Sequence, residues 1–324
     1  QAVSQKLLVG APGQILTYDL SGKQFTLTSK YAEAGTASSW MLPRGGDSDQ
    51  LYAVNENADD LRLFGFADKV IAPGATPTKF TGSTGVVSLA FNADKTRLLG
   101  GGYSNGEVDV WNSEAADGSL TLIKTLKLTG ALGPQQTSHR AHQVLLDPTG
   151  QFFAVPDLGG DQVVLVDARA DKYELVGTTV PTGAGTGPRH GQFIGGGGGA
   201  DGAPATHYVV VTELSNELIL YKLTYTSAGI SFAEVDRQTT IPAGTPQPID
   251  PAGAAAGEVQ VVGATDVYAS NRRTGLPTGD SIVFFKLDAA SNKLVFKQLV
   301  QSGGVFPRHF SFDAQGEVMF VANQ

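Results

Sequence analysis

The sequence predicts an all-β protein built as a β-propeller. Glycine is frequent, 41 of 324 residues, and Thr, Ser and Asn interrupt the chain often, whereas helix signals are weak. Short apolar or alternating runs between these turn residues are typical of strands. Similar strand pairs also recur about every 50 residues, and a period of that length with four short strands per unit is typical of a propeller blade.

The repeated unit is an apolar strand, a polar turn and an alternating strand. It occurs at "LYAVNENADDLRLF" from Leu51, "LLGGGYSNGEVDVW" from Leu98, "FFAVPDLGGDQVVLV" from Phe152, "YVVVTELSNELILY" from Tyr208 and "VYASNRRTGLPTGDSIVFF" from Val267, and "MFVANQ" from Met319 begins it again. Aligning Asn55, Tyr103, Asp157, Glu213, Asn271 and Asn323 gives steps of 48, 54, 56, 58 and 52 residues. These pairs are the two middle strands, b and c, of each blade.

The strands that flank each b–c pair recur with the same period. A short strand a precedes most units, at "VVSLAF", "HQVLLD", "HGQFI", "EVQVV" and "HFSFD". A strand d follows them, at "LTLIKTLKL", "YELVGTTV", "FAEVDRQTT" and "LVFKQLV". Four-stranded blades keep their open edges short and protected.

The two ends of the sequence hold incomplete blades. "LLVGA", "QILTYDL" and "FTLTSKY" resemble strands b, c and d, and the last residues supply only a and b. We therefore predict one domain over residues 1–324, a seven-bladed propeller of four-stranded antiparallel blades whose last blade and ring closure lack roughly three C-terminal strands. Truncation is favoured over an open ring, since an open ring would expose unpaired edges.

Composition excludes several classes of partner. The formal charge is -8 without a basic stripe, which disfavours nucleic acid and anionic membrane surfaces. The absence of cysteine removes disulfides, thiolate nucleophiles and cysteine metal sites. The first residue, Gln1, and the acidic, Gly/Thr/Ser-rich composition favour a secreted protein, with a cytoplasmic one as the alternative. The sequence leaves the oligomeric state open.

Five motifs in order resemble one family. They are "SHRAHQVLLDPTGQFFAVPDLGGDQVVLV", "GPRHGQF", "VVVTELSNELILY", "YASNR" with "DSIVFFKLD", and "FPRHFSFDAQGEVMFVAN". Together they are similar to the seven-bladed lactonases, which include 6-phosphogluconolactonases of the cycloisomerase-like type and fungal carboxy-cis,cis-muconate cyclases. The resemblance implies a cofactor-free enzyme acting on a small anionic lactone, or on the diacid that closes to one, at the mouth of the central channel.

The resemblance also implies a set of site residues. His142 matches the family histidine and Glu213 the glutamate, and we take both as acid/base candidates. Arg189 and Arg272 match arginines, and Arg308 lies in a recurring Pro-Arg motif, so these three are candidates for binding the substrate anion.

Hairpin topology supports this set independently. In each blade, strand a leaves one face and strand b returns to it. His142, Arg189 and Arg308 lie at the start of an a strand, and Glu213 and Arg272 at the end of a b strand. All five are therefore expected on one mouth. Lactone hydrolysis needs a base to activate water and a cation to hold an anion, which these residue types supply.

Four of the five residues also have a structural interpretation. Glu213 would cap its b–c turn, as the polar residues aligned with it suggest. His142 would be a buried structural histidine. Arg189 and Arg308 share the context Pro-Arg-His-x-x-Phe, which would serve pairing between blades, with His190 and His309 as packing residues.

Two kinds of loop complete the prediction. "GGGGGADGAPAT", Gly195 to Thr206, lacks the lysine and helix of a phosphate loop and is interpreted as flexible. Pro242 to Glu258 and Arg273 to Asp280 lie on the site face, where they would shape the pocket. No His or carboxylate constellation has metal-ligand spacing, so we expect no metal and no cofactor.

Three functions stay open. They are a lactone hydrolase, a muconate cyclase, and a non-catalytic propeller that binds a ligand or protein. Catalysis requires the arginines, His142 and Glu213 to surround one point, whereas a binding scaffold would pair them in ion pairs between blades.

Overall fold

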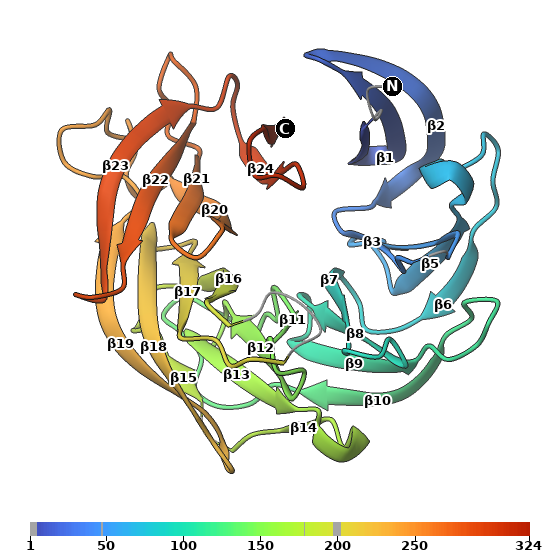
Figure 1. The fold of residues 1–324 in the computed structure, drawn as a ribbon, viewed down its shortest axis with the longest axis horizontal. Coiled ribbons are helices and arrows are strands. Elements are labelled where there is room, and N and C mark those ends of the chain that lie inside the picture. Colours follow the sequence, from blue (N-terminus) through green and yellow to red (C-terminus); the bar gives the residue numbers. More distant parts are fainter. Residues whose placement is uncertain (1–4, 47, 178, 197–201) are drawn as a thin grey trace. The chain divides into compact units, whose positions relative to one another are not determined.

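The structure, a computed structural model, describes residues 5–46, 48–177, 179–196 and 202–324. Antiparallel sheets dominate these residues, and the all-β propeller prediction is confirmed (Figure 1). The sheets belong to two compact units. The first contains the described residues up to Leu128 with Arg140–Val144, and the second contains Thr129–His139 and Leu145–Gln324.

The first unit contains three sheets in its described residues. One pairs β1 (Gln5–Ser21) with β2 (Gln24–Ala37). The second is β3 (Met41–Pro43), β4 (Gln50–Val54), β5 (Asp60–Gly65) and β6 (Thr78–Thr81), with a 3₁₀ turn, η1 (Ala67–Lys69), after β5. The third is β7 (Val86–Phe91), β8 (Arg97–Gly102), β9 (Glu107–Asn112) and β10 (Thr121–Lys127).

The second unit contains four sheets in its described residues. The first is β11 (Leu145–Leu146), β12 (Phe152–Asp157), β13 (Gln162–Asp167), β14 (Glu174–Leu175) and β15 (Val180–Pro181), with the 3₁₀ turn η2 (Arg169–Asp171). The next two are β16 (Pro188–Ile194), β17 (His207–Thr212), β18 (Glu217–Thr226), β19 (Gly229–Thr239), and β20 (Ala255–Val262), β21 (Asp266–Arg272), β22 (Ser281–Asp288), β23 (Lys293–Gln301). The last pairs β24 (Pro307–Phe312) with β25 (Met319–Asn323).

The core of the second unit lies between adjacent sheets, and β17 shows why its sequence is continuously apolar. Successive side chains of a strand point to opposite faces. Tyr208 and Val210 pack toward the sheet of β12 and β13, whereas Val209 and Val211 pack toward that of β20 to β22. Both faces of β17 are therefore buried, and all four side chains are fully enclosed.

The first strand of several sheets carries a β-bulge near its start. Arg189 is the extra residue between the pairs Pro188–Thr212 and His190–Val211. Arg308 occupies the same position in β24. In β20 the two residues 257–258 face one residue of β21. A bulge frees one residue from the ladder and re-aims its side chain.

The N-terminal prediction is wrong in one respect. The runs expected as separate strands b and c form one continuous strand, β1, which pairs with β2 from Pro12 onward. Gly13 has a φ of 69° and lies at a register shift between Pro12 and Gln14. At this shift the extra residues belong to β2, where residues 33–36 face the single residue Gly13, so β1 continues past the glycine without turning back.

The blade formed by β11 to β15 is also less regular than predicted. Its expected strand a, "HQVLLD", is reduced to β11, because the preceding Val144 N–H donates to the Ser88 side chain, 3.1 Å away. Its expected strand d, "YELVGTTV", is divided into β14 and β15, which both pair with β13.

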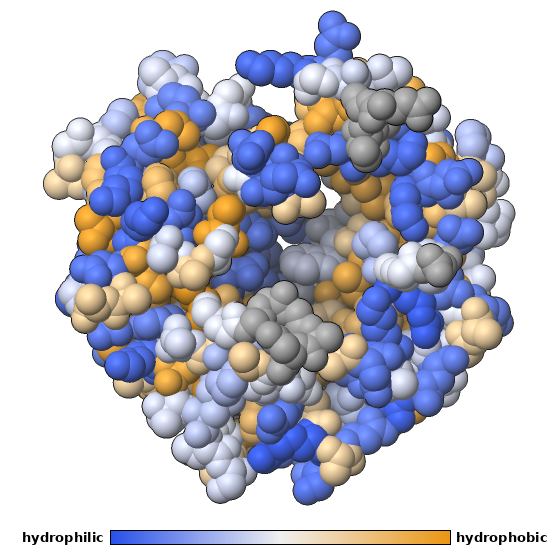
Figure 2. All heavy atoms as spheres, in the orientation of Figure 1, coloured by the Kyte–Doolittle hydropathy of each residue, from blue (hydrophilic) through white to orange (hydrophobic). Residues whose placement is uncertain are grey.

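The visible surface is mainly hydrophilic, with apolar residues distributed among polar ones (Figure 2). Exposed apolar side chains occur on several strands, for example Phe25 and Leu27 of β2 and Val300 of β23. Within the described residues, helices are too short and too polar to traverse a bilayer.

Candidate functional site

Three predicted site residues meet in the second unit. Arg189 is the bulged residue of β16, Glu213 follows β17, and Arg272 ends β21. Nη2 of Arg272 donates to Oε2 of Glu213 at 2.8 Å. Nε of Arg189 lies 3.1 Å from the same oxygen. This contact is an ion pair that does not have the geometry of a hydrogen bond. These three side chains therefore lie together, as hairpin topology predicts.

The pairing register explains why Glu213 does not cap its turn. The last b–c pairs are Asp157–Gln162, Thr212–Glu217 and Asn271–Ser281. Thr212, not Glu213, is therefore equivalent to Asp157 and Asn271, and the alignment on Glu213 is wrong by one residue. The Thr212 hydroxyl accepts the Glu217 N–H at 3.0 Å, so the turn is capped without Glu213.

The start of β20 holds both arginines in place. Nη1 of Arg189 donates to the carbonyl of Gly257 and Nη2 of Arg272 to that of Ala256, each at 2.8 Å. The expected loop Pro242–Glu258 is wrong at its end, since Ala255–Glu258 already belong to β20. The part before β20 packs against the loop after β21, where the Ile249 N–H donates to the carbonyl of Thr274 at 2.8 Å.

Gly257 is required by this close packing. A Cβ there would lie 2.7 Å from Oγ of Ser270 and 2.9 Å from Nε of Arg272. Both distances are shorter than side-chain contacts normally allow, and Arg272 is only 4% exposed. The guanidinium of Arg272 also lies 5.1 Å from the ring centroid of Phe306, within cation–π range.

Two guanidinium groups meet one carboxylate oxygen at Glu213. Burial and the neighbouring Arg272 lower the pKa of Arg189 to about 10, with Arg308 contributing, yet the group stays protonated at neutral pH. Burial works to raise the pKa of Glu213, but the charges of Arg272 and Arg189 outweigh it and the pKa is lowered. Glu213 is therefore a carboxylate at neutral pH and has no proton to donate.

Arg308 and His142 belong to different compact units. Arg308 lies on β24, close enough to Arg189 for its charge to act there. His142 belongs to the first unit, where it is buried and its ring contacts the edge of Tyr103 with centroids 5.3 Å apart. The expected meeting of His142 with Glu213 stays a prediction.

A second cluster, of His190, Glu258 and His309, was not predicted as functional. Nδ1 of His309 donates to Oε2 of Glu258 at 2.7 Å. Nδ1 of His190 lies 3.1 Å from both oxygens of Glu258, and the Val259 N–H donates to Oε1 at 3.0 Å. The repeated Pro-Arg-His motif was the available signal, since the sheet between the two motifs has Gly-Glu at that position. The structure shows that His190 and His309 do more than pack.

Protonation differs between the two imidazoles. Burial lowers the pKa of His190 to about 4, despite Glu258 beside it. Withdrawal from water also acts to lower the pKa of His309, but the bond to Glu258 outweighs it and the pKa is raised. Glu258 is fully buried, yet the two imidazoles hold its pKa well below the usual range. Neither this cluster nor any other group of His, Cys, Asp and Glu side chains among the described residues has an arrangement that could hold a metal ion.

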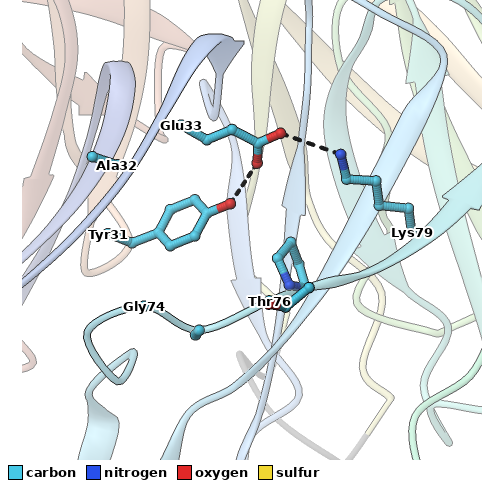
Figure 3. Close-up of a pocket in the computed structure, with 8 residues that line it drawn as sticks. Tyr31, Ala32, Glu33, Gly74, Thr76 and Lys79 are labelled. Carbon is cyan, nitrogen blue, oxygen red and sulfur yellow. Dashed lines mark hydrogen bonds and ion pairs between the residues drawn. The ribbon is translucent and has the colours of Figure 1, made fainter.

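The first unit contains a cavity of ≈ 370 Å³ (Figure 3). Its carboxylate, Glu33, accepts hydrogen bonds from the Tyr31 hydroxyl and from Lys79 at 3.2 Å. Arg62 adds bonds at 2.7 and 3.3 Å. Because both oxygens already have donors, this cavity is a poorer candidate for chemistry than the arginine site.

Of the predicted loops, Gly195–Thr206 lies partly outside the described residues, which end at 196 and resume at 202. Its lack of a phosphate-binding role therefore stays a prediction. The described residues Gly195 and Gly196 have φ values of 72° and 80°, as expected where the chain leaves β16.

Comparisons with known proteins agree with the fold. A protein of Arthroderma benhamiae named "Probable 6-phosphogluconolactonase" is 26% identical over 314 residues, 95% of this chain and 76% of that protein. The structure of a periplasmic gluconolactonase of Pseudomonas aeruginosa matches with a TM-score of 0.79 at 23% identity, over 98% of this chain and 89% of that one. A Lactobacillus plantarum protein matches with a TM-score of 0.80 at 23% identity, over 99% and 89%.

The chain also matches a family model over nearly its whole length. The family model described as "Lactonase, 7-bladed beta-propeller" covers residues 5–324, which is nearly the entire sequence. The chain therefore belongs to the lactonase family of seven-bladed β-propellers.

Proposed function

We propose that this protein hydrolyses a small anionic lactone, and that Arg189 and Arg272 bind the anionic group of the substrate. The observation that supports this most directly is the sharing of one Glu213 oxygen by two buried guanidinium groups. One carboxylate compensates only one of the two charges.

The local charge balance favours an anionic ligand. The other nearby carboxylate, Glu258, lies against two imidazoles, those of His190 and His309. Buried charges without partners are costly. An anion that completes the balance would therefore bind with a large electrostatic gain, and a guanidinium offers two parallel donors to a carboxylate or phosphate.

A purely structural ion pair between sheets explains less. Such a pair needs one cation for each anion, whereas here two guanidinium groups share one oxygen of Glu213. The names of the relatives, one a 6-phosphogluconolactonase and one a gluconolactonase, support a lactone as the class of substrate.

The test is a matched pair of lactones followed in a pH-stat. 6-Phosphogluconolactone and gluconolactone share the ester but differ in the phosphate. We expect kcat/KM to be higher for the phosphorylated member and the difference to shrink in Arg272→Gln. A 3-carboxy-cis,cis-muconate included in the panel distinguishes cyclisation from hydrolysis, and an absence of turnover for every compound would contradict the proposal.

A further inference from the structure

We infer that His309 is the group that moves the proton in lactone opening, with Glu258 and His190 as its positioning residues. The inference rests on the proposed function and adds a residue that the family resemblance does not imply. The geometric basis is that His190 and His309 both contact the buried carboxylate of Glu258. The three residues come from β16, β24 and β20, which are the first strands of three sheets.

Glu258 fixes the orientation of His309. The carboxylate is 1% exposed and accepts from His309 Nδ1 at 2.7 Å, so Nδ1 carries the hydrogen and Nε2 is left as the basic nitrogen. The side chain of His309 is 51% exposed, and Nε2 has no hydrogen-bond partner among the described residues. A basic nitrogen on a half-exposed ring that is oriented by a buried acid suits general base catalysis.

His190 closes the other side of the carboxylate. It is 5% exposed at its side chain and too enclosed to meet a substrate, so its role is to hold Glu258. Nη1 of Arg189 lies 3.4 Å from Nδ1 of His190, and Arg189 also bonds to Gly257, the neighbour of Glu258. The cluster is thus contiguous with the arginines that bind the anion.

The surrounding charges set the working pH of His309. Glu258 from β20 raises the pKa of the ring, and Arg189 from β16 opposes it. His190 from β16 is neutral near neutral pH, Arg308 precedes His309 on β24, and Arg272 of β21 is directed to Glu213. With Glu258 dominant, the base becomes available only above the ordinary imidazole pKa of about 6.5.

The step balances without a cofactor. Nε2 of His309 takes a proton from water as the water oxygen forms a bond to the lactone carbonyl carbon. The ring C–O bond then breaks, and the proton passes from Nε2 to the departing ring oxygen. Lactone and water give one hydroxy acid.

Three variants test the inference. His309→Ala is expected to lower kcat about 10²–10⁴-fold, the usual contribution of a general base, and added imidazole should restore part of it because the site is open. Glu258→Gln should shift the acid limb of the kcat/KM profile to lower pH. His207→Gln is the matched control. It alters a buried histidine that bonds to Asn292 and lies at the start of β17, whereas the arginine site lies at the end of that strand. This variant should leave the profile unchanged.

The outcomes separate the two proposals. If the wild type opens no lactone, both the proposed function and the role of His309 are lost. If the wild type is active and His309→Ala retains its kcat, or the acid limb does not move in Glu258→Gln while its circular dichroism stays native, only the role of His309 is overturned.

Discussion

Glu213 accepts a hydrogen bond from Arg272 at 2.8 Å, and this bond joins the sheet of β16–β19 to the sheet of β20–β23. The same oxygen also lies against Arg189, so one carboxylate organises the whole arginine site.

The first prediction concerns stability. Glu213→Gln removes the anion between two buried guanidinium groups and should cost about 3 kcal/mol in the free energy of unfolding, the lower end for breaking a buried pair because the Glu213 side chain is 19% exposed. Urea unfolding measures it. Glu217→Gln, whose pair with Arg237 is more exposed, should cost about 1 kcal/mol or less. Equal losses in the two variants would show that Glu213 is an ordinary surface partner.

The second prediction separates charge from shape. Arg189→Lys keeps a cation but loses the planar fork, so KM for an anionic lactone should rise about 10–100-fold with a smaller change in kcat. Steady-state kinetics with the phosphorylated and neutral lactones measure it. Arg237→Lys on β19 is the matched control, since that arginine pairs with Glu217 and Glu234 only at the surface. A KM that is unchanged in Arg189→Lys would remove Arg189 from the anion site.

The third prediction concerns the backbone beneath the arginines. Gly257→Ala places a methyl group within 2.7 Å of Ser270 and 2.9 Å of Arg272, and should destabilise the fold by about 1–3 kcal/mol. It should also weaken anion binding, because Arg272 must move. Gly177→Ala, where a Cβ meets no atom within 4 Å, is the control. Thermal unfolding with and without phosphate distinguishes the two effects, and a native response to phosphate in Gly257→Ala would argue against displacement of Arg272.

The fourth prediction is a pH dependence of stability. His190 has a folded pKa of about 4, below the ordinary value of about 6.5, so the unfolded chain binds a proton that the folded chain does not. The contribution of His190 to stability should therefore fall as the pH drops from about 6.5 to 4, with a slope of up to about 1.4 kcal/mol per pH unit.

His190→Gln tests this slope. The amide keeps a donor for Glu258 but does not titrate, so the free energy of unfolding should depend less steeply on pH in the same window. Urea titrations at several pH values measure the difference. Parallel curves for the two proteins would mean that His190 is not the neutral buried group described above.

The sequence predicted the arginine site better than it predicted its neighbours. The convergence of Arg189 with Arg272 and Glu213 follows from hairpin topology alone, which the repeat period reveals. The role of Glu213 was harder, because the register of β17 is set by backbone pairing and not by the similarity of turn residues. The residue that caps the turn is therefore Thr212 and not Glu213.

The role of Glu258 could not be predicted from the sequence for a related reason. It follows a long Pro/Gly/Ala-rich segment that resembles a loop, although Ala255–Glu258 already pair or bulge within β20. The distance between Glu258 and the two histidines depends on how three sheets pack, which no local pattern encodes. The fusion of the first two expected strands into β1 likewise shows no local signal, because Gly13, with a φ of 69°, lies at a register shift and not at a hairpin turn.

The bulges at the starts of β16 and β24 have an evolutionary consequence. Arg189 and Arg308 are the residues left out of the ladder, so neither side chain is constrained by a cross-strand neighbour directly opposite it. A relative could exchange either position for another residue type and acquire a new specificity while every inter-strand backbone bond is conserved. Diversification of substrate preference on this scaffold is therefore expected to concentrate at these two positions.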